Sequence, residues 1–147
     1  MNDYKYFNVQ IKSDVIQRNG SVKQEKDHLL VRAVSVSDAE TQVIKRFENS
    51  DEFQNLEVIS VGVSKITNVI PEMSGENYLN TTVIFEYENE NGSTKESKDY
   101  YLVISDLKNA ENIVNKSLNH IPLESRVSSI SESKISYILD YQNDIVD

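Results

Sequence analysis

The densest group of side chains that could do chemistry is the run of carboxylates at Glu86, Glu88 and Glu90. On a strand these alternate residues would share one face, because successive side chains point to opposite faces. Three carboxylates on one face could bind a divalent cation. Such a run is also typical of a solvated sheet edge. We interpret it as a candidate acidic surface and expect no metal site.

A second group of residues mixes aromatic rings with positive charge. Tyrosines beside lysines can stack the bases of single-stranded DNA while the cations follow its backbone. Tyrosine is also typical of strands and of protein interfaces. The formal net charge of −9 favours the interface, since proteins that bind DNA or anionic membranes normally carry the opposite balance. The members of this candidate interface or stacking surface are Tyr4, Lys5, Tyr6, Lys98, Tyr100 and Tyr101.

The sequence lacks the usual signatures of catalysis. It has no cysteine, which excludes disulfides, thiol catalysis and zinc–thiolate sites. Its two histidines, His28 and His120, fall at non-equivalent places in the repeat described below. Neither of the glycine-rich phosphate-loop patterns, GxGxxG or GxxxxGK[ST], is present, and neither is GxSxG or HExxH. We therefore expect neither an enzyme nor a cofactor.

The elements that must position these side chains are encoded twice. Residues 19–31 read NGSVKQEKDHLLV and residues 91–103 read NGSTKESKDYYLV, with 8 of 13 positions identical. Farther along the chain, the Ser-Lys-Ile of residues 64–66 returns at 133–135. Self-similarity of this kind predicts two copies of one structural unit.

Each copy predicts two strands joined by a hairpin turn and, after a helix, a third strand. Residues 4–17 alternate apolar and polar side chains, which indicates a half-buried strand. The Asn-Gly of residues 18–21 suits a tight turn, because it accepts positive φ. The returning strand, 28–36, is apolar on both faces, as expected for a central strand. The third strand spans 57–63, and the second copy repeats the pattern at 78–88, 90–93, 100–104 and 126–131.

A helix is predicted between the second and third strands of each copy. Ser37 and Glu40 form a capping-box pattern, and Asp106 stands at the corresponding cap. A short apolar triplet spaced i, i+3, i+4 closes each copy and predicts a single helical turn, at 66–70 and 135–139. The apolar stripes of the helices are Ala39, Val43, Ile44 and Phe47, and Leu107, Ala110, Val114 and Leu118.

These elements predict an α+β fold in which tandem duplicated β-β-α-β units share one two-layer core, with a mostly antiparallel sheet and two helices on one face. Each half is too short to bury more than a thin core alone, so we expect one domain over residues 1–147. Repeat 1 is expected at 4–70, a linker at 71–77, repeat 2 at 78–141 and a tail at 142–147.

The charge is shared unevenly between the two halves. Residues 1–75 carry nine basic and eleven acidic side chains, whereas the remainder carries six and thirteen. No apolar run approaches the ~20 residues that a membrane span needs, and the first residues do not resemble a secretory signal. We expect a soluble protein without a membrane partner, located in the cytoplasm of the host cell or in a virion.

The duplicated pattern resembles an uncharacterised family of small two-repeat proteins from gut Bacteroidetes and their tailed, crAss-like phages. The resemblance implies a phage or phage-derived context, and it supplies no activity or catalytic residue. The residues that carry it are 30–31, 37–40, 58–63 and 66–70 in the first copy, with 101–103, 110–111 and 135–139 in the second.

The leading hypothesis is a non-enzymatic, phage-type binding protein that acts by protein–protein contact with a phage or host partner. It would be a virion or assembly component or an inhibitor of a host factor, and it would self-associate, for example as a homodimer. The first alternative is a single-stranded DNA-binding accessory protein of phage replication, although nucleic acid is the less favoured partner. The second alternative is a protein that sequesters a small molecule between the copies.

Overall fold

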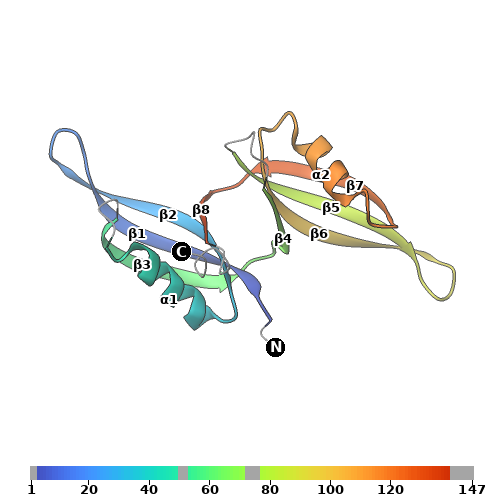
Figure 1. The fold of residues 1–147 in the computed structure, drawn as a ribbon, viewed down its shortest axis with the longest axis horizontal. Coiled ribbons are helices and arrows are strands. Elements are labelled where there is room, and N and C mark those ends of the chain that lie inside the picture. Colours follow the sequence, from blue (N-terminus) through green and yellow to red (C-terminus); the bar gives the residue numbers. More distant parts are fainter. Residues whose placement is uncertain (1–2, 50–52, 72–76, 140–147) are drawn as a thin grey trace. The chain divides into compact units, whose positions relative to one another are not determined.

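The computed structural model describes residues 3–49, 53–71 and 77–139, and these residues form two compact units. Unit 1 contains the described residues up to Ser64 together with those from Ile135 onward, and unit 2 contains Lys65 to Lys134. Each unit is a four-stranded sheet with one helix (Figure 1). The α+β class is therefore confirmed, with the strands divided between two sheets.

Unit 1 begins with a long antiparallel hairpin made of β1 (Lys5–Ile16) and β2 (Val22–Ala33). Helix α1 (Val36–Phe47) follows, and β3 (Gln54–Val63) then returns to pair antiparallel with β1. The fourth strand, β8 (Ile135–Leu139), pairs parallel with β2. The strand order is β3-β1-β2-β8, so β2 is a central strand as predicted.

Unit 2 has the same topology. Strands β5 (Tyr78–Glu88) and β6 (Thr94–Ile104) form its hairpin, helix α2 (Ala110–Leu118) follows, and β7 (Glu124–Glu132) pairs antiparallel with β5. The fourth strand is β4 (Asn68–Pro71), which pairs parallel with β6. The order is β4-β6-β5-β7, which matches unit 1 element by element.

The fourth strands are exchanged between the two halves of the sequence. Strand β4 follows the third strand of unit 1 yet joins the sheet of unit 2, and β8 follows the third strand of unit 2 yet joins unit 1. The chain crosses at the two Ser-Lys-Ile segments. The Ser64 amide donates to the Tyr6 carbonyl and the Ser133 amide to the Tyr78 carbonyl, each at 2.9 Å. The predicted helical turns at 66–70 and 135–139 are therefore wrong.

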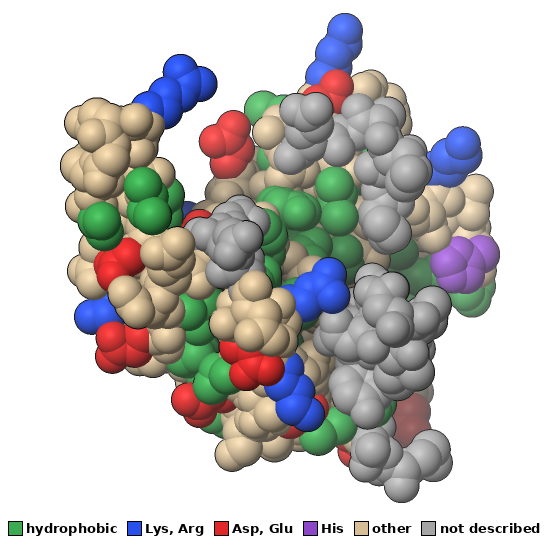
Figure 2. Space-filling model, turned by 60° about the vertical axis from the view of Figure 1, so that its left-hand side comes forward, with side chains coloured by type: hydrophobic (Ala, Val, Ile, Leu, Met, Phe, Trp, Pro, Cys, Tyr) green, Lys and Arg blue, Asp and Glu red, His purple; other side chains and the backbone are tan. Residues whose placement is uncertain are grey.

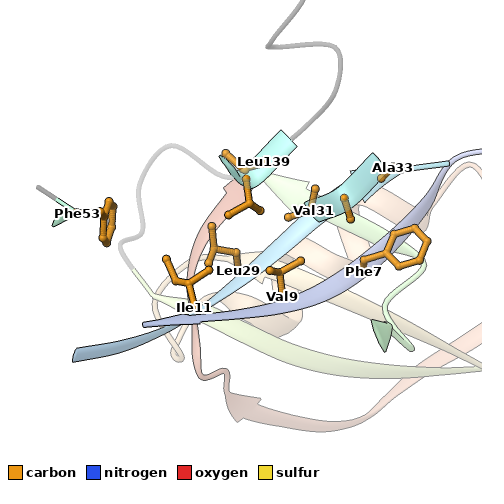
Figure 3. Close-up of a cluster of buried hydrophobic side chains, with 10 residues drawn as sticks. Phe7, Val9, Ile11, Leu29, Val31, Ala33, Phe53 and Leu139 are labelled. Atoms are coloured by element: carbon orange, nitrogen blue, oxygen red, sulfur yellow. The ribbon is translucent and has the colours of Figure 1, made fainter. Parts of the chain in front are cut away.

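Each unit buries its own set of side chains, so the expected shared core is replaced by two. In unit 1 the buried cluster lies between the helix and one sheet face, and Leu139 of β8 lies beside Leu29 and Val31 of β2 (Figure 3). In unit 2 the corresponding cluster includes Leu79 and Val103. Each core therefore consists of one helix packed on one face of a four-stranded sheet, while Leu30 and Leu102, on the opposite faces of the two sheets, are also buried.

An aromatic cluster connects β8 to the end of α1 and to the residue just before β3 in unit 1. The Tyr137 ring lies edge-on to Phe53, with centroids 5.6 Å apart, and to Phe47 at the end of α1, with centroids 6.0 Å apart. Phe47 and Phe53 contact each other at 4.7 Å. Edge-to-face pairs of this kind stabilise a core by about 0.5–1.5 kcal/mol each beyond the area they bury. Phe53, which lies between the predicted helix and the predicted third strand, is thus a core residue.

The helices start differently from the predicted caps. The Ser35 hydroxyl accepts from the Asp38 amide, and the Asp38 carboxylate accepts from the Val34 amide, so the reciprocal cap lies two residues before Ser37. In the second copy Asn109 is the N-cap residue, and the Asp106 carboxylate accepts from its amide.

The predicted helix stripes are partly wrong. Ile44 is 42% exposed, and the Gln42 amide is buried in its place, donating to the Arg32 carbonyl at 3.1 Å. Leu107 precedes α2 and is exposed. Neither described helix is long and apolar enough to cross a membrane.

The first prediction concerns the strand exchange. A protease site inserted between Gly75 and Glu76 should allow the chain to be cut without separating its halves, because each half supplies a strand to the other's sheet. Gel filtration of the cut protein should show one species of the intact mass, whereas the same sample in denaturant should show two fragments. Separation of the fragments under native conditions would contradict the exchange.

The second prediction concerns the aromatic cluster. Tyr137→Thr keeps a residue of high β-propensity on β8 but removes the ring that contacts Phe47 and Phe53, so the free energy of unfolding should fall by about 2–3 kcal/mol. Tyr87→Thr, at an exposed position of β5, is the matched control and should change it by less than about 1 kcal/mol. Urea unfolding measures both, and equal losses would show that Tyr137 makes no special contribution.

Candidate interaction surfaces

The structure divides the predicted tyrosine–lysine surface between the units. Lys5 and Tyr6 lie on β1 of unit 1 with Tyr4 just before it, whereas Lys98, Tyr100 and Tyr101 lie on β6 of unit 2. Each unit therefore holds only part of the set.

Tyr101 is a core residue and not a stacking platform. Only 5% of it is exposed, and it packs in the core of unit 2 against the helix-covered face. Burial raises the pKa of its hydroxyl above 10.0, and the nearby Asp99 carboxylate raises it further. A hydrogen bond with the Asn68 side chain on β4 acts in the opposite direction on this pKa. Tyr100, the next residue, points to the opposite face, because side chains alternate along a strand.

The remaining tyrosines are engaged by their own unit. The Arg32 guanidinium of β2 lies 5.1 Å from the centre of the Tyr4 ring, a cation–π contact. The Tyr100 carbonyl accepts from the Thr67 amide at 2.8 Å and from the Thr67 hydroxyl at 3.1 Å, just before β4 begins. Tyr4, Tyr6 and Tyr100 are half-buried. The arrangement suits structural contacts better than base stacking.

Of the predicted acidic residues, Glu86 belongs to a cross-strand ion-pair network. The Arg126 guanidinium on β7 donates to the Glu86 carboxylate at 2.9 Å and to the Glu96 carboxylate of β6 at 3.2 Å. The hydrogen bond with Glu96 raises the pKa of Arg126. Among residues 3–49, 53–71 and 77–139, no group of three His, Asp or Glu side chains could hold a metal ion. Glu88 and Glu90 stay exposed, so the acidic surface is reduced to the end of the hairpin.

Arg126 was not identified in the sequence as a partner of Glu86 because the two residues are 40 positions apart. The signal that could have found it is the alternation of side chains along β5 and β7, once these two strands are paired. In the register of β5 and β7, Arg126 lies opposite Ile84, two residues before Glu86 and on the same strand face. Glu86 and Arg126, together with Glu124, line a shallow surface hollow. An ion-pair network this exposed contributes little to stability, because water and salt screen its charges.

The two hairpin ends are surfaces that the sequence reasoning did not single out. Hairpin tip 1 comprises residues 15–24 and hairpin tip 2 comprises residues 87–96, the equivalent positions of the second copy. In each, a glycine has positive φ, +86° at Gly20 and +80° at Gly92, and the flanking residues close the turn by matching hydrogen bonds. This is the three-residue hairpin loop in which a type I turn precedes a left-handed glycine.

Both tips extend beyond the rest of their unit (Figure 1). The pairing of β3 with β1 ends at Asp14, and that of β7 with β5 ends at Glu86. On the other side, β8 pairs only with His28–Val31 and β4 only with Tyr101–Ile104. The ends of the hairpins are therefore two-stranded ribbons that no third strand covers in the described part of the chain.

Tip 1 carries an exposed apolar pair. Ile16 and Val22 are register partners at the end of the ribbon, and they are 57% and 63% exposed. Tip 2 has Glu88 and Thr94 at these positions, and its exposed ring, Tyr87, pairs with Lys95. Elsewhere, acidic and basic side chains are interspersed over the face drawn in Figure 2. The two tips thus differ in surface chemistry.

The third prediction concerns Tyr101. Because its pKa is raised in the folded state, the folded protein holds this proton more tightly than the unfolded chain does. Its contribution to stability is present below pH 10 and is lost as the pH rises through the folded-state pKa. An ultraviolet titration of the phenols should show one late-titrating group that Tyr101→Phe removes and Tyr87→Phe leaves in place. If all phenols of the folded protein titrate together, with no late-titrating group, the burial of Tyr101 is contradicted.

Comparison with known proteins identifies a family but no activity. No curated protein matches the chain. The profile of a domain family described as a domain of unknown function, DUF4494, matches residues 5–141. This match covers both units of the described structure, including the exchanged strands. The chain therefore belongs to the DUF4494 family, an uncharacterised domain family.

Proposed function

We propose that this protein is a non-enzymatic binding protein that acts by protein–protein contact. The observation that carries the proposal is the exposed Ile16–Val22 pair at the end of hairpin tip 1. Two branched apolar side chains at the end of a projecting ribbon contribute little to the core of their own unit. Burying such a pair against a partner would stabilise a complex by about 25 cal/mol per Å² of apolar surface removed from water.

The sheet edges favour the tips over strand addition as the binding mode. Strand β3 has an extra residue, Ile59, at its pairing with β1, and β7 has an extra residue, Ser128, at the equivalent place. Bulges of this kind bend and twist an edge strand and discourage another strand from pairing with it. The outer edges of β3 and β7 are therefore less suited to a partner than the side chains of tip 1.

The proposed context is that of a phage or phage-derived protein in the host cytoplasm or in a virion, as the resemblance to proteins of gut Bacteroidetes and their crAss-like phages implies. A virion or assembly component and an inhibitor of a host factor both fit a small binding protein without a catalytic site. Single-stranded DNA is a weaker candidate partner because Tyr101 is buried and the net charge is −9. A small-molecule ligand has less support, because the hollow beside Arg126 is shallow and open to solvent.

The fourth prediction is the result of a pull-down from host cells, with tagged protein and with the eluates analysed by mass spectrometry before and after nuclease treatment. The wild type should retain a defined protein partner after nuclease. Ile16→Thr with Val22→Thr should lose that partner, since it removes the apolar pair but keeps β-branched residues in the strands.

The matched control is Ile44→Gln, which removes an exposed apolar side chain from α1, far along the sequence from the tip. It should retain the partner. A partner that disappears with nuclease would contradict the proposal and support nucleic-acid binding. Equal capture by the wild type and the tip variant would show that tip 1 is not the binding surface.

A further inference from the structure

We infer that hairpin tip 1 of one molecule binds hairpin tip 2 of a second copy of this chain. The inference rests on the proposed function and names the partner of the same surface. Every molecule carries both tips, so every molecule can act as donor and as acceptor. The contact is heterologous, because two different surfaces meet in it.

The first support is charge. Tip 1 contains Arg18 and Lys23 and no acidic residue, so its formal charge is +2. Tip 2 contains Glu88, Glu90 and Glu96 against Lys95, so its formal charge is −2. The tips are equivalent segments of the two copies, and they have opposite charge. Complementary potentials of this kind steer association and select partners.

The second support is the exposure of the charged groups. Arg18, Lys23, Glu88 and Glu90 are all exposed, and they lie on ribbons that no third strand covers among the described residues. The third acidic residue of tip 2, Glu96, already forms an ion pair with Arg126. Glu88 and Glu90 thus remain available to the cations of tip 1.

The third support is apolar surface on both sides of the contact. Ile16 and Val22 offer branched side chains on tip 1, and Tyr87, which is 42% exposed, offers a ring on tip 2. Tyrosine is enriched at protein interfaces because its ring buries area while its hydroxyl stays hydrogen-bonded. The apolar groups supply affinity and the charges select tip 2 as the acceptor.

The same features argue against the other pairings of tips. Tip 1 against tip 1 would bring two positive surfaces together, and tip 2 against tip 2 would bring two negative ones together. A head-to-tail contact repeats along a series of molecules, giving open chains or closed rings. Assembly should therefore be concentration-dependent and should weaken with salt, because exposed charges are screened.

The test is a charge exchange followed by sedimentation velocity of the full chain. Variant A is Arg18→Glu with Lys23→Glu, which makes both tips acidic. Variant B is Glu88→Lys with Glu90→Lys, which makes both tips basic. The wild type should associate as its concentration rises at about 0.05 M salt and should dissociate at about 0.5 M. Each variant alone should associate at least about tenfold more weakly than the wild type.

An equimolar mixture of A and B should recover association, because tip 1 of each variant is complementary to tip 2 of the other. This recovery separates a direct contact from a general loss of stability, which mixing could not repair. In the wild-type charge background, Ile16→Thr with Val22→Thr should weaken association by a similar factor, and Ile44→Gln should leave it unchanged.

Three results would overturn the inference. The first is a wild type that stays monomeric at low salt, and the second is a mixture of A and B that stays monomeric. The third is binding of tip 1 to vesicles that contain anionic phosphatidylserine, without any self-association of the protein. The last would identify tip 1 as a membrane-surface contact. A monomeric wild type that still captures a nuclease-resistant partner through Ile16 and Val22 would overturn the inference alone and leave the proposed function standing.

Discussion

The parallel pairing of β8 with β2 and of β4 with β6 is the interaction on which the rest of the structure depends. Without β8, unit 1 would lose Leu139 from its core and Tyr137 from the aromatic cluster. The edge of β2 that does not pair with β1 would also be left without a partner strand. Without β4, unit 2 would lose Ile70 and the Asn68 partner of a buried hydroxyl. Because each missing strand comes from the other half of the sequence, neither half can complete its sheet in this arrangement by itself.

The residues at these pairings are matched in a way that favours the exchange. Tyr137 and Asn68 occupy equivalent positions of the two copies. Tyr137 lies opposite Leu29, and Asn68 lies opposite Tyr101, with which it forms a hydrogen bond. In the unexchanged arrangement Tyr137 would meet Tyr101, and two rings would compete for one place in a close-packed core. Asn68 would then meet Leu29 and bring an amide to the aromatic cluster, where an unpaired polar group costs free energy.

The shortness of the exchanged strands also creates the candidate binding surface. Strands β4 and β8 cover only the part of each hairpin nearest the helix, so the outer parts of both hairpins remain as ribbons. The covered parts of the two copies are similar, with apolar residues on the helix-facing side. The ribbons differ, with Ile16 and Val22 in one and Glu88 and Thr94 in the other. Two units that have the same topology and a similar core pattern but differ at their hairpin ends are suited to binding through those ends.

The sequence by itself determined the duplication pattern, the two hairpins with their glycine turns, and the presence of one helix in each copy. These features depend on local periodicity and on turn chemistry, and both can be read within a few residues. Only the tertiary structure decided the secondary structure of residues 66–70 and 135–139, since a short apolar run fits a helical turn as well as a strand. The open edges of β6 and β2 made them strands. Tertiary structure also decided that Tyr101 is buried in the core and that Glu86 forms an ion pair with Arg126. Pairing between strands that are distant in sequence sets which side chains are buried and which charged groups come into contact.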